Sequence, residues 1–248
     1  DNSIVMSGPA VTWHGGTSYD QSGDIVWWFD FSSVTTPGTY FIYDPLNAKR
    51  SFTFDIRADV YTEVLKKSVR MFYYQRSGFA KTAPYAFDWT DGASHLGAQQ
   101  DLDCRLVTNP VPGTSKQLQG GWFDAGDYNK YVNFAYEPIH DLSLAYIERP
   151  EVWTDDYNIP ESGNGIPDLL DEMKWELDWL RRMQLANGSM LMKVSVTDFS
   201  AASPPSADSG ARRYGPAQAS ATRTAASMFA IAAIAYNLSG HPAMQLYA

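Results

Sequence analysis

The first 57 residues alternate short aromatic and β-branched runs with turn sequences. The runs are DIVWWFDFS (24–32), GTYFIYD (38–44) and RSFTFDI (50–56), and they are separated by TTPG and DPLN. Runs of this length and composition, bounded by Pro, Gly, Asn and Asp, are typical of β-strands. Three or four such strands predict a small β-sandwich with incomplete sheets over residues 1–57.

The spacing of apolar positions becomes helical after residue 57. In DVYTEVLKKSVRMFYYQRSG (59–78), apolar side chains occur at positions 60, 64, 65, 69 and 72, and a glycine ends the segment. This periodicity predicts an amphipathic helix with a C-terminal stop. We therefore expect one domain over residues 1–57 and a second, mainly helical domain over residues 58–248.

Two further helices and two long loops are expected in the second domain. IPDLLDEMKWELDWLRRMQLANG (166–188) has proline near its start, acids in its first turns and arginines near its end, as helices do. The alanine-rich stretch 217–238 predicts another helix that its neighbours can approach closely. Residues 79–119 show little periodicity and predict a long irregular loop, and residues 198–218, rich in Ser, Pro and Gly, predict an exposed one.

Composition and charge exclude several classes of protein. The chain has 248 residues, 44% of them hydrophobic and 14% aromatic, which is ample for a packed core. Its 19 basic and 28 acidic side chains give a formal net charge of −9, which repels phosphate backbones and anionic lipid. We therefore expect neither nucleic acid nor a membrane surface as a partner. The longest nearly apolar run, 225–236, is too short to span a bilayer.

Two aspartates, Asp124 and Asp127, stand three positions apart in GGWFDAGDYNKYV (120–132). A helical turn of the backbone brings side chains at this spacing together, and the glycines let a ligand approach the main chain. Converging carboxylates repel one another, and this repulsion can keep one of them basic enough to take a proton from water. The alternative is a solvated turn in which each aspartate caps backbone amides.

The residues around the pair resemble a known signature. GGWFDAGDYNKYV is similar to the Asp-Ala-Gly-Asp motif of family 9 glycoside hydrolases, the inverting cellulases, with its preceding Gly-Gly-Trp and following Tyr-x-Lys-Tyr. IPESGNGIPDLLDEMKWELDWLRRMQ (159–184) resembles a second stretch of that family, and FYYQRSG (72–78) resembles its first barrel helix. Residues 1–57 look like the latter part of the immunoglobulin-like module that precedes the catalytic domain in one branch.

The resemblance implies a mainly α fold, an α/α barrel of six helical hairpins preceded by a small immunoglobulin-like β-sandwich. The resemblance implies that Asp127 is the general base and that Asp124 helps it hold the attacking water. An inverting hydrolase needs such a base on the face opposite the leaving group, with the acid about 6.5–9.5 Å away. Two carboxylates on one water fix its direction better than one.

Two aromatic residues of the motif are candidate substrate contacts. Trp122 and Tyr128 could stack on the apolar faces of sugar rings, because aromatic surfaces suit them. The alternative for Trp122, which follows two glycines, is a packing anchor.

The stretch PESGNGIPD (160–168) is rich in oxygen ligands and precedes an expected helix. Glu161, Asn164 and Asp168, with backbone carbonyls, form a candidate calcium site. The resembled family often carries structural calcium. The alternative is helix capping, because acids near a helix N-terminus complement its dipole without a metal.

Zinc is not expected. Some module-bearing members of the resembled family bind zinc through Cys and His near the first helix and just before the signature. The corresponding positions here are Ser77, Cys104 with Arg105, and Phe123, which leave one thiol and no histidine. A closed structural zinc site needs four ligands.

The resemblance implies a secreted enzyme that cuts β-1,4-glucan chains by inversion, with endo action. One alternative is an exo-acting β-glucosidase or glucosaminidase of the same family, if the 79–119 loop blocks one end of the cleft. Another is a non-catalytic carbohydrate-binding protein on the same scaffold. Six helical hairpins need twelve helices, and only four or five are expected after residue 57. We therefore expect the chain to need the remaining C-terminal part of the catalytic domain as its partner.

Overall fold

The computed structural model describes residues 3–245 of the chain. The chain divides into two compact units, Asp1–Glu63 and Val64–Ala248. The division lies in the first turn of helix α1 (Thr62–Gln75), a few residues after the position at which the change of periodicity suggests a boundary.

The N-terminal unit consists of three two-stranded antiparallel sheets. They pair β1 with β2, β3 with β6, and β4 with β5. The strands are β1 Val11–Thr12, β2 Trp27–Trp28, β3 Gly38–Tyr40, β4 Tyr43–Asp44, β5 Lys49–Arg50 and β6 Phe54–Ile56. Each expected run thus contributes strand residues, but the strands are only two or three residues long.

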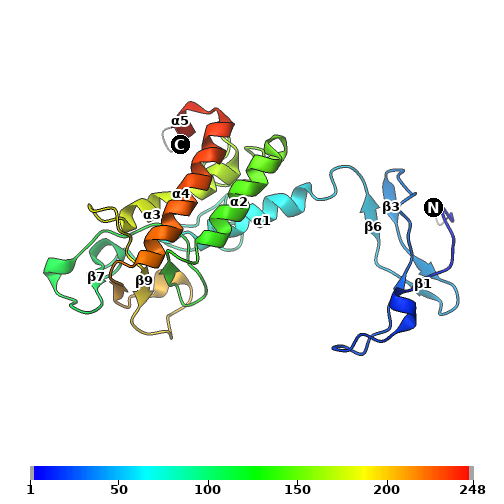
Figure 1. Ribbon diagram of the computed structural model, residues 1–248, viewed down its shortest axis with the longest axis horizontal. Coiled ribbons are helices and arrows are strands. Elements are labelled where there is room, and N and C mark those ends of the chain that lie inside the picture. Colours follow the sequence, from blue (N-terminus) through cyan, green and yellow to red (C-terminus); the bar gives the residue numbers. More distant parts are fainter. Residues whose placement is uncertain (1–2, 246–248) are drawn as a thin grey trace. The chain divides into compact units, whose positions relative to one another are not determined.

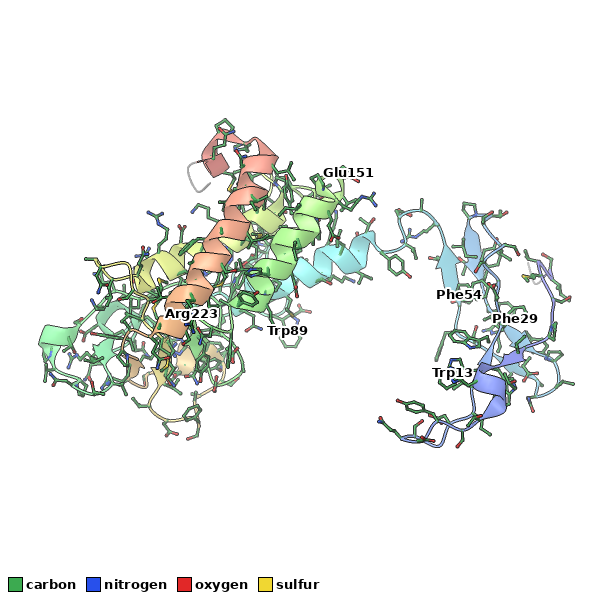
Figure 2. All side chains as sticks on the ribbon, viewed as in Figure 1. Trp13, Phe29, Phe54, Trp89, Glu151 and Arg223 are labelled. Atoms are coloured by element: carbon green, nitrogen blue, oxygen red, sulfur yellow. The ribbon has the colours of Figure 1, made fainter. Side chains whose placement is uncertain are left out.

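Aromatic side chains, among them Trp13, Phe29 and Phe54, are spread over this unit (Figure 2). None of residues 3–63 is buried, and Phe52 is 97% exposed. A few rings contact one another, such as Phe31 against Phe54 of β6 with ring centroids 5.3 Å apart. The immunoglobulin-like sandwich therefore stays a prediction, because these sheets enclose no core.

Figure 1 shows the helices of the C-terminal unit. They pack around a large hydrophobic core, and two smaller clusters of buried residues lie in the same unit. Its helices are α1, α2 Tyr136–Glu148, α3 Asp168–Met183, α4 Ala219–Ser239 and α5 Pro242–Gln245. Helices α2 and α4 lie side by side in Figure 1 and share the largest helix contact. Four small residues are buried along α4, which lets its backbone approach the neighbouring helices: Ala221, Ala225, Ala232 and Ala235. The barrel to which these helices would belong stays a prediction.

A four-stranded sheet lies beside the helices in the order β7-β10-β9-β8. Its strands are β7 Arg105–Leu106, β8 Lys130–Tyr131, β9 Lys193–Val196 and β10 Arg212–Tyr214. Strand β10 pairs parallel with β7 and antiparallel with β9. The stretch 198–218 is therefore not wholly an exposed loop, because Arg212 and Tyr214 are buried in this sheet.

Short 3-10 helices connect these elements in both units. They are η1 Trp13–Gly16, η2 Asp101–Asp103, η3 Pro112–Thr114, η4 Pro150–Val152 and η5 Pro205–Ala207. Outside η2, η3 and β7, residues 79–119 have no helix or strand, as their weak periodicity predicts. Among residues 3–245, no helix combines the length and apolar character that crossing a bilayer requires.

Candidate active site

The segment that precedes the aspartate pair is pinned to α1 and α3. The backbone N–H of Phe123 donates to the carbonyl of Gln75 at 2.8 Å, at the end of α1. Gly121 has φ +76°, and a Cβ there would stand 2.7 Å from the ring of Trp179 on α3. Only glycine fits so close to a buried indole in this backbone conformation. The Gly-Gly of the motif therefore serves a close approach of chain segments.

Trp122 is held by two buried glutamates of α3. Its backbone N–H donates to Glu176 at 2.7 Å, and its indole N–H donates to Glu172 at 3.0 Å. The residue is 7% exposed. Burial raises the pKa of Glu176 to about 8. This placement favours the packing anchor for Trp122, with little ring surface left for a sugar.

The two aspartates lie on one tight turn. The N–H of Tyr128 donates to the carbonyl of Ala125 at 3.1 Å, and the N–H of Asp124 donates to the carbonyl of Asn129 at 2.8 Å. Asp124 is exposed and Asp127 is half-buried. Gly126 between them has open space where a Cβ would stand. The turn therefore leaves both carboxylates accessible from outside.

The two carboxylates influence each other electrostatically. Partial desolvation raises the pKa of Asp124, and the negative charge of Asp127 raises it further. Among residues 3–245, no hydrogen-bond donor engages the carboxylate of Asp124. Asp127 instead accepts two hydrogen bonds from Asn129. A carboxylate with a raised pKa beside an anchored one is suited to sharing a proton or a water.

Tyr128 takes a left-handed backbone conformation with φ +60°. Its ring lies 5.1 Å from that of Phe123 and 5.4 Å from that of His95, and its hydroxyl donates to the carbonyl of Ala202 at 3.1 Å. It is 8% exposed. A sugar contact by Tyr128 stays a prediction that this burial does not favour.

A cluster of buried charged residues contacts the chain at the Tyr128 end of the turn. The sequence did not reveal this cluster. Asp101 is fully buried and pairs with Lys130 at 2.6 Å and with Arg212 at 2.5 Å. Burial alone would raise the pKa of Asp101, but the charges of Arg212 and Lys130 hold it below its usual range. Arg212 also donates to the carbonyl of Tyr128 at 2.7 Å. These residues meet only through the fold, so their spacing in the sequence gives no signal.

The three candidate calcium ligands have other partners. Both carboxylate oxygens of Glu161 accept hydrogen bonds from Arg76, at 2.9 and 3.0 Å. Asn164 donates to Asp171 at 2.8 Å and accepts the N–H of Ile166 at 2.7 Å. Asp168 accepts from the N–H of Tyr157 and the hydroxyl of Ser162, at 2.5 and 2.8 Å.

These are the contacts that the loop makes without a metal ion, and among the described residues the buried Oδ1 of Asp168 has no hydrogen-bond partner. In the described part of the chain, no three His, Cys, Asp or Glu side chains are arranged to hold a metal ion. Calcium binding at this loop stays a prediction. Cys104, the thiol at the position that zinc binding would use, is fully buried, and burial raises its pKa to about 12. It therefore remains a thiol near neutral pH and packs as a small apolar side chain.

The helical unit thus presents two aspartates on one anchored, accessible turn, an arrangement that is suited to acid–base chemistry. Residues 61–247 match the family described as glycosyl hydrolase family 9, and the chain belongs to this family.

Relatives and a solved structure agree with this assignment. "Endoglucanase D" of Acetivibrio thermocellus is 32% identical over 237 residues, which are 94% of this chain and 36% of that protein. "Cellulose 1,4-beta-cellobiosidase" of the same organism is 33% identical over 209 residues, 74% of this chain and 23% of that protein. The crystal structure of a metagenome-derived family 9 endoglucanase superimposes with a TM-score of 0.78 at 34% identity, covering 90% of this chain and 40% of that one. The chain thus spans about a quarter to a third of the length of these curated relatives.

Proposed function

We propose that the enzyme containing this chain hydrolyses β-1,4-glucosidic bonds of cellulose or a related β-glucan by single-displacement inversion. The observation that carries the proposal is the accessible Asp124–Asp127 pair on a turn whose neighbours are fixed by buried charges. Family membership and endoglucanase relatives support the same reaction class. We further propose that the enzyme is secreted, because its polymeric substrate lies outside cells.

In this mechanism Asp127 is the general base and Asp124 its partner. Asp127 is anchored by hydrogen bonds and takes a proton from the attacking water as the water adds to the anomeric carbon. Asp124 is not anchored in this way and accepts a second hydrogen bond from the same water. Two acceptors on one water direct its lone pair at the sugar, which is the orientation that single displacement requires.

The general acid belongs to another part of the enzyme. The two glutamates that are candidates by residue type, Glu161 and Glu172, are both tied to Arg76 by pairs of hydrogen bonds. Glu172 is also fully buried. We propose that the remaining C-terminal part of the catalytic domain packs on the unit and supplies the acid. Exposed apolar residues on α4, Ile234 and Leu238, would lie in this contact.

The test is Asp127→Asn in the enzyme expressed from its complete reading frame. An amide cannot accept the proton, so we expect the turnover number on soluble cello-oligosaccharides to fall about 10²–10⁴-fold with an unchanged unfolding midpoint. Asp30→Asn is the matched control, because Asp30 also accepts the N–H of the residue two positions on, Ser32, at 2.9 Å. Turnover within about twofold of wild type for Asp127→Asn would remove the assignment.

Product analysis separates the alternatives. Proton NMR of the first products should show the α-anomer, because inversion of a β-bond produces it. Endo action should give oligosaccharides of mixed length, whereas release of monomer alone identifies an exo-acting glucosidase or glucosaminidase. Binding to cellulose with no release of reducing ends would identify a carbohydrate-binding protein instead.

A further inference from the structure

Asn129 contacts both oxygens of the Asp127 carboxylate. Its backbone N–H donates to Oδ1 of Asp127 at 3.1 Å, and its side-chain Nδ2 donates to Oδ2 at 2.8 Å. Asn129 is fully buried, whereas Asp127 is half-buried. One residue therefore fixes both ends of the carboxylate, and it does so from the side away from solvent.

The amide of Asn129 can be oriented in only one way. Its Oδ1 accepts the backbone N–H of Val196 at 2.9 Å, and the second N–H of Nδ2 donates to the hydroxyl of Tyr131 at 3.0 Å. A backbone N–H is always a donor, so the oxygen must face Val196 and the nitrogen must face Asp127. If Oδ1 and Nδ2 of Asn129 were exchanged, Nδ2 would face the N–H of Val196 and Oδ1 would face the carboxylate of Asp127, and neither contact is a hydrogen bond.

The sheet explains why Val196 needs this oxygen. Strands β8 and β9 pair Lys130 with Val194, and continuing that register would pair Tyr128 with Val196. The left-handed Tyr128 instead turns its carbonyl to Arg212. The side-chain oxygen of Asn129 therefore accepts the Val196 N–H in place of the Tyr128 carbonyl. In this way the end of the sheet holds the side-chain amide of Asn129 in place.

We propose that Asn129 is a positioning residue for the general base Asp127. It occupies one acceptor site on each carboxylate oxygen and leaves the others for the attacking water. This inference rests on the proposed function, because it assigns Asn129 a role only if Asp127 is the base.

The test compares Asn129→Asp with wild type in the enzyme expressed from its complete reading frame. The substitution keeps size and shape and still accepts the N–H of Val196, but it turns the donor toward Asp127 into a carboxylate oxygen. We expect the acidic limb of the pH profile of kcat/KM to move upward by about one pH unit or more. We also expect kcat to fall up to about 100-fold with little change in KM, because Asn129 is buried away from the substrate.

The acidic limb separates positioning from a merely structural role. Partial unfolding caused by a buried carboxyl group increases as pH rises above the unfolded pKa of that group, so it lowers the alkaline side of the profile and does not move the acidic limb upward. Asn129→Ser keeps the backbone N–H bond and should shift the limb in the same direction by less. Asn47→Asp is the matched control, because Asn47 bonds Asp44 in the same way, from N at 3.3 Å and Nδ2 at 2.7 Å, in the N-terminal unit. Its profile should match that of wild type.

The possible results distinguish this inference from the proposed function. If Asp127→Asn is inactive and the profiles of both Asn129 variants superimpose on wild type after scaling, the positioning role is overturned and the base assignment stands. If Asp127→Asn remains active, the proposed function itself fails. A shifted limb in Asn129→Asp, absent in Asn47→Asp, supports the positioning role.

Discussion

Arg76 joins two carboxylates in the interior of the helical unit, and its removal should be severely destabilising. Its guanidinium donates to Glu172 at 3.0 and 2.8 Å and to Glu161 at 2.9 and 3.0 Å. Arg76 and Glu172 are fully buried, whereas the side chain of Glu161 is 31% exposed. We expect Arg76→Met to fill most of the space, because Met is flexible and unbranched.

The magnitude follows from the group that is left without a partner. Breaking a buried ion pair by removing one member costs about 3–5 kcal/mol, because the remaining charge stays buried. Glu172 would carry this cost, and Glu161 would turn to water. For a unit of this size, one kcal/mol moves the unfolding midpoint by about 2–4 °C. We therefore expect the midpoint of Arg76→Met to fall by about 6–20 °C at neutral pH.

The loss should depend on pH in a definite direction. Burial raises the pKa of Glu172, and Arg76 opposes that rise. Without Arg76 the pKa rises further, so the folded variant holds a proton that the unfolded chain releases above about pH 4. A carboxyl group with a raised folded pKa is least costly below its unfolded pKa. The deficit of the variant should therefore be small near pH 4 and grow toward pH 7.

Calorimetry of wild type, Arg76→Met, Glu172→Gln and the double variant measures this effect. Glu172→Gln still accepts the indole N–H of Trp122, so the double variant should regain more than half of the loss. Arg149→Met is the control, because the side chains of Arg149 and its partner Glu151 are 68% and 60% exposed. Glu151 is labelled in Figure 2. Exposed pairs contribute at most about 1 kcal/mol. A midpoint within about 2 °C of wild type for Arg76→Met, or a double variant no more stable than it, would refute the reasoning.

Three further predictions concern pH, metal and completeness. Burial raises the pKa of Asp171 to about 7, so the stability that this group provides is full below its unfolded pKa, about 4, and is lost as pH rises to about 7. Asp171→Asn should make the unfolding midpoint depend less on pH over that range. An unchanged pH dependence would contradict the raised pKa of Asp171. If the 160–168 loop holds calcium, EGTA should lower the midpoint and added calcium should restore it; an unchanged midpoint would leave the loop to capping and ion pairing. Purified residues 1–248, verified by mass spectrometry, should hydrolyse no glucan, and robust turnover would overturn the need for an external acid.

Helices with strong periodicity could be predicted, and the weakly patterned one could not. The expected helices at 59–78, 166–188 and 217–238 correspond to α1, α3 and α4, with shorter ends for the first two. Helix α2 was missed, because Pro138 and His140 interrupt its apolar pattern and no capping residue marks its start. It packs on α4, which follows some 80 residues later, so its helical state depends on tertiary contact.

The four-stranded sheet was missed for a similar reason. Its strands have two to four residues, which is too short for alternation to be recognised. Strand β7 pairs with β10 from more than 100 residues away. A segment this short gains its conformation from its partners, so local propensity carries almost no information about it.

The placement of the two aspartates on one turn could be predicted from the sequence, because the contacts that form the turn are local. Asp124 and Asp127 share one turn, and the glycines that the turn needs stand beside them. The supporting charges follow no such rule. Asp101 and Arg212 are 111 positions apart and meet only when β10 joins the sheet, so Arg212 fell in a stretch whose Ser, Pro and Gly content indicated an exposed loop.

In the proposed mechanism, burial separates the carboxylates that support the motif from the two that react. On the Trp122 side the motif is held by Glu172 and Glu176, and on the Tyr128 side by Asp101, all of which are at most 2% exposed. Asp124 and Asp127 reach solvent. A group that must gain and lose a proton in each turnover needs water, whereas a group that fixes backbone geometry must keep one protonation state. Buried ionic contacts add little net stability, and their use here fits a role in fixing orientation. Removing one of these buried partners should therefore change the pH profile and kcat of the enzyme more than it changes KM.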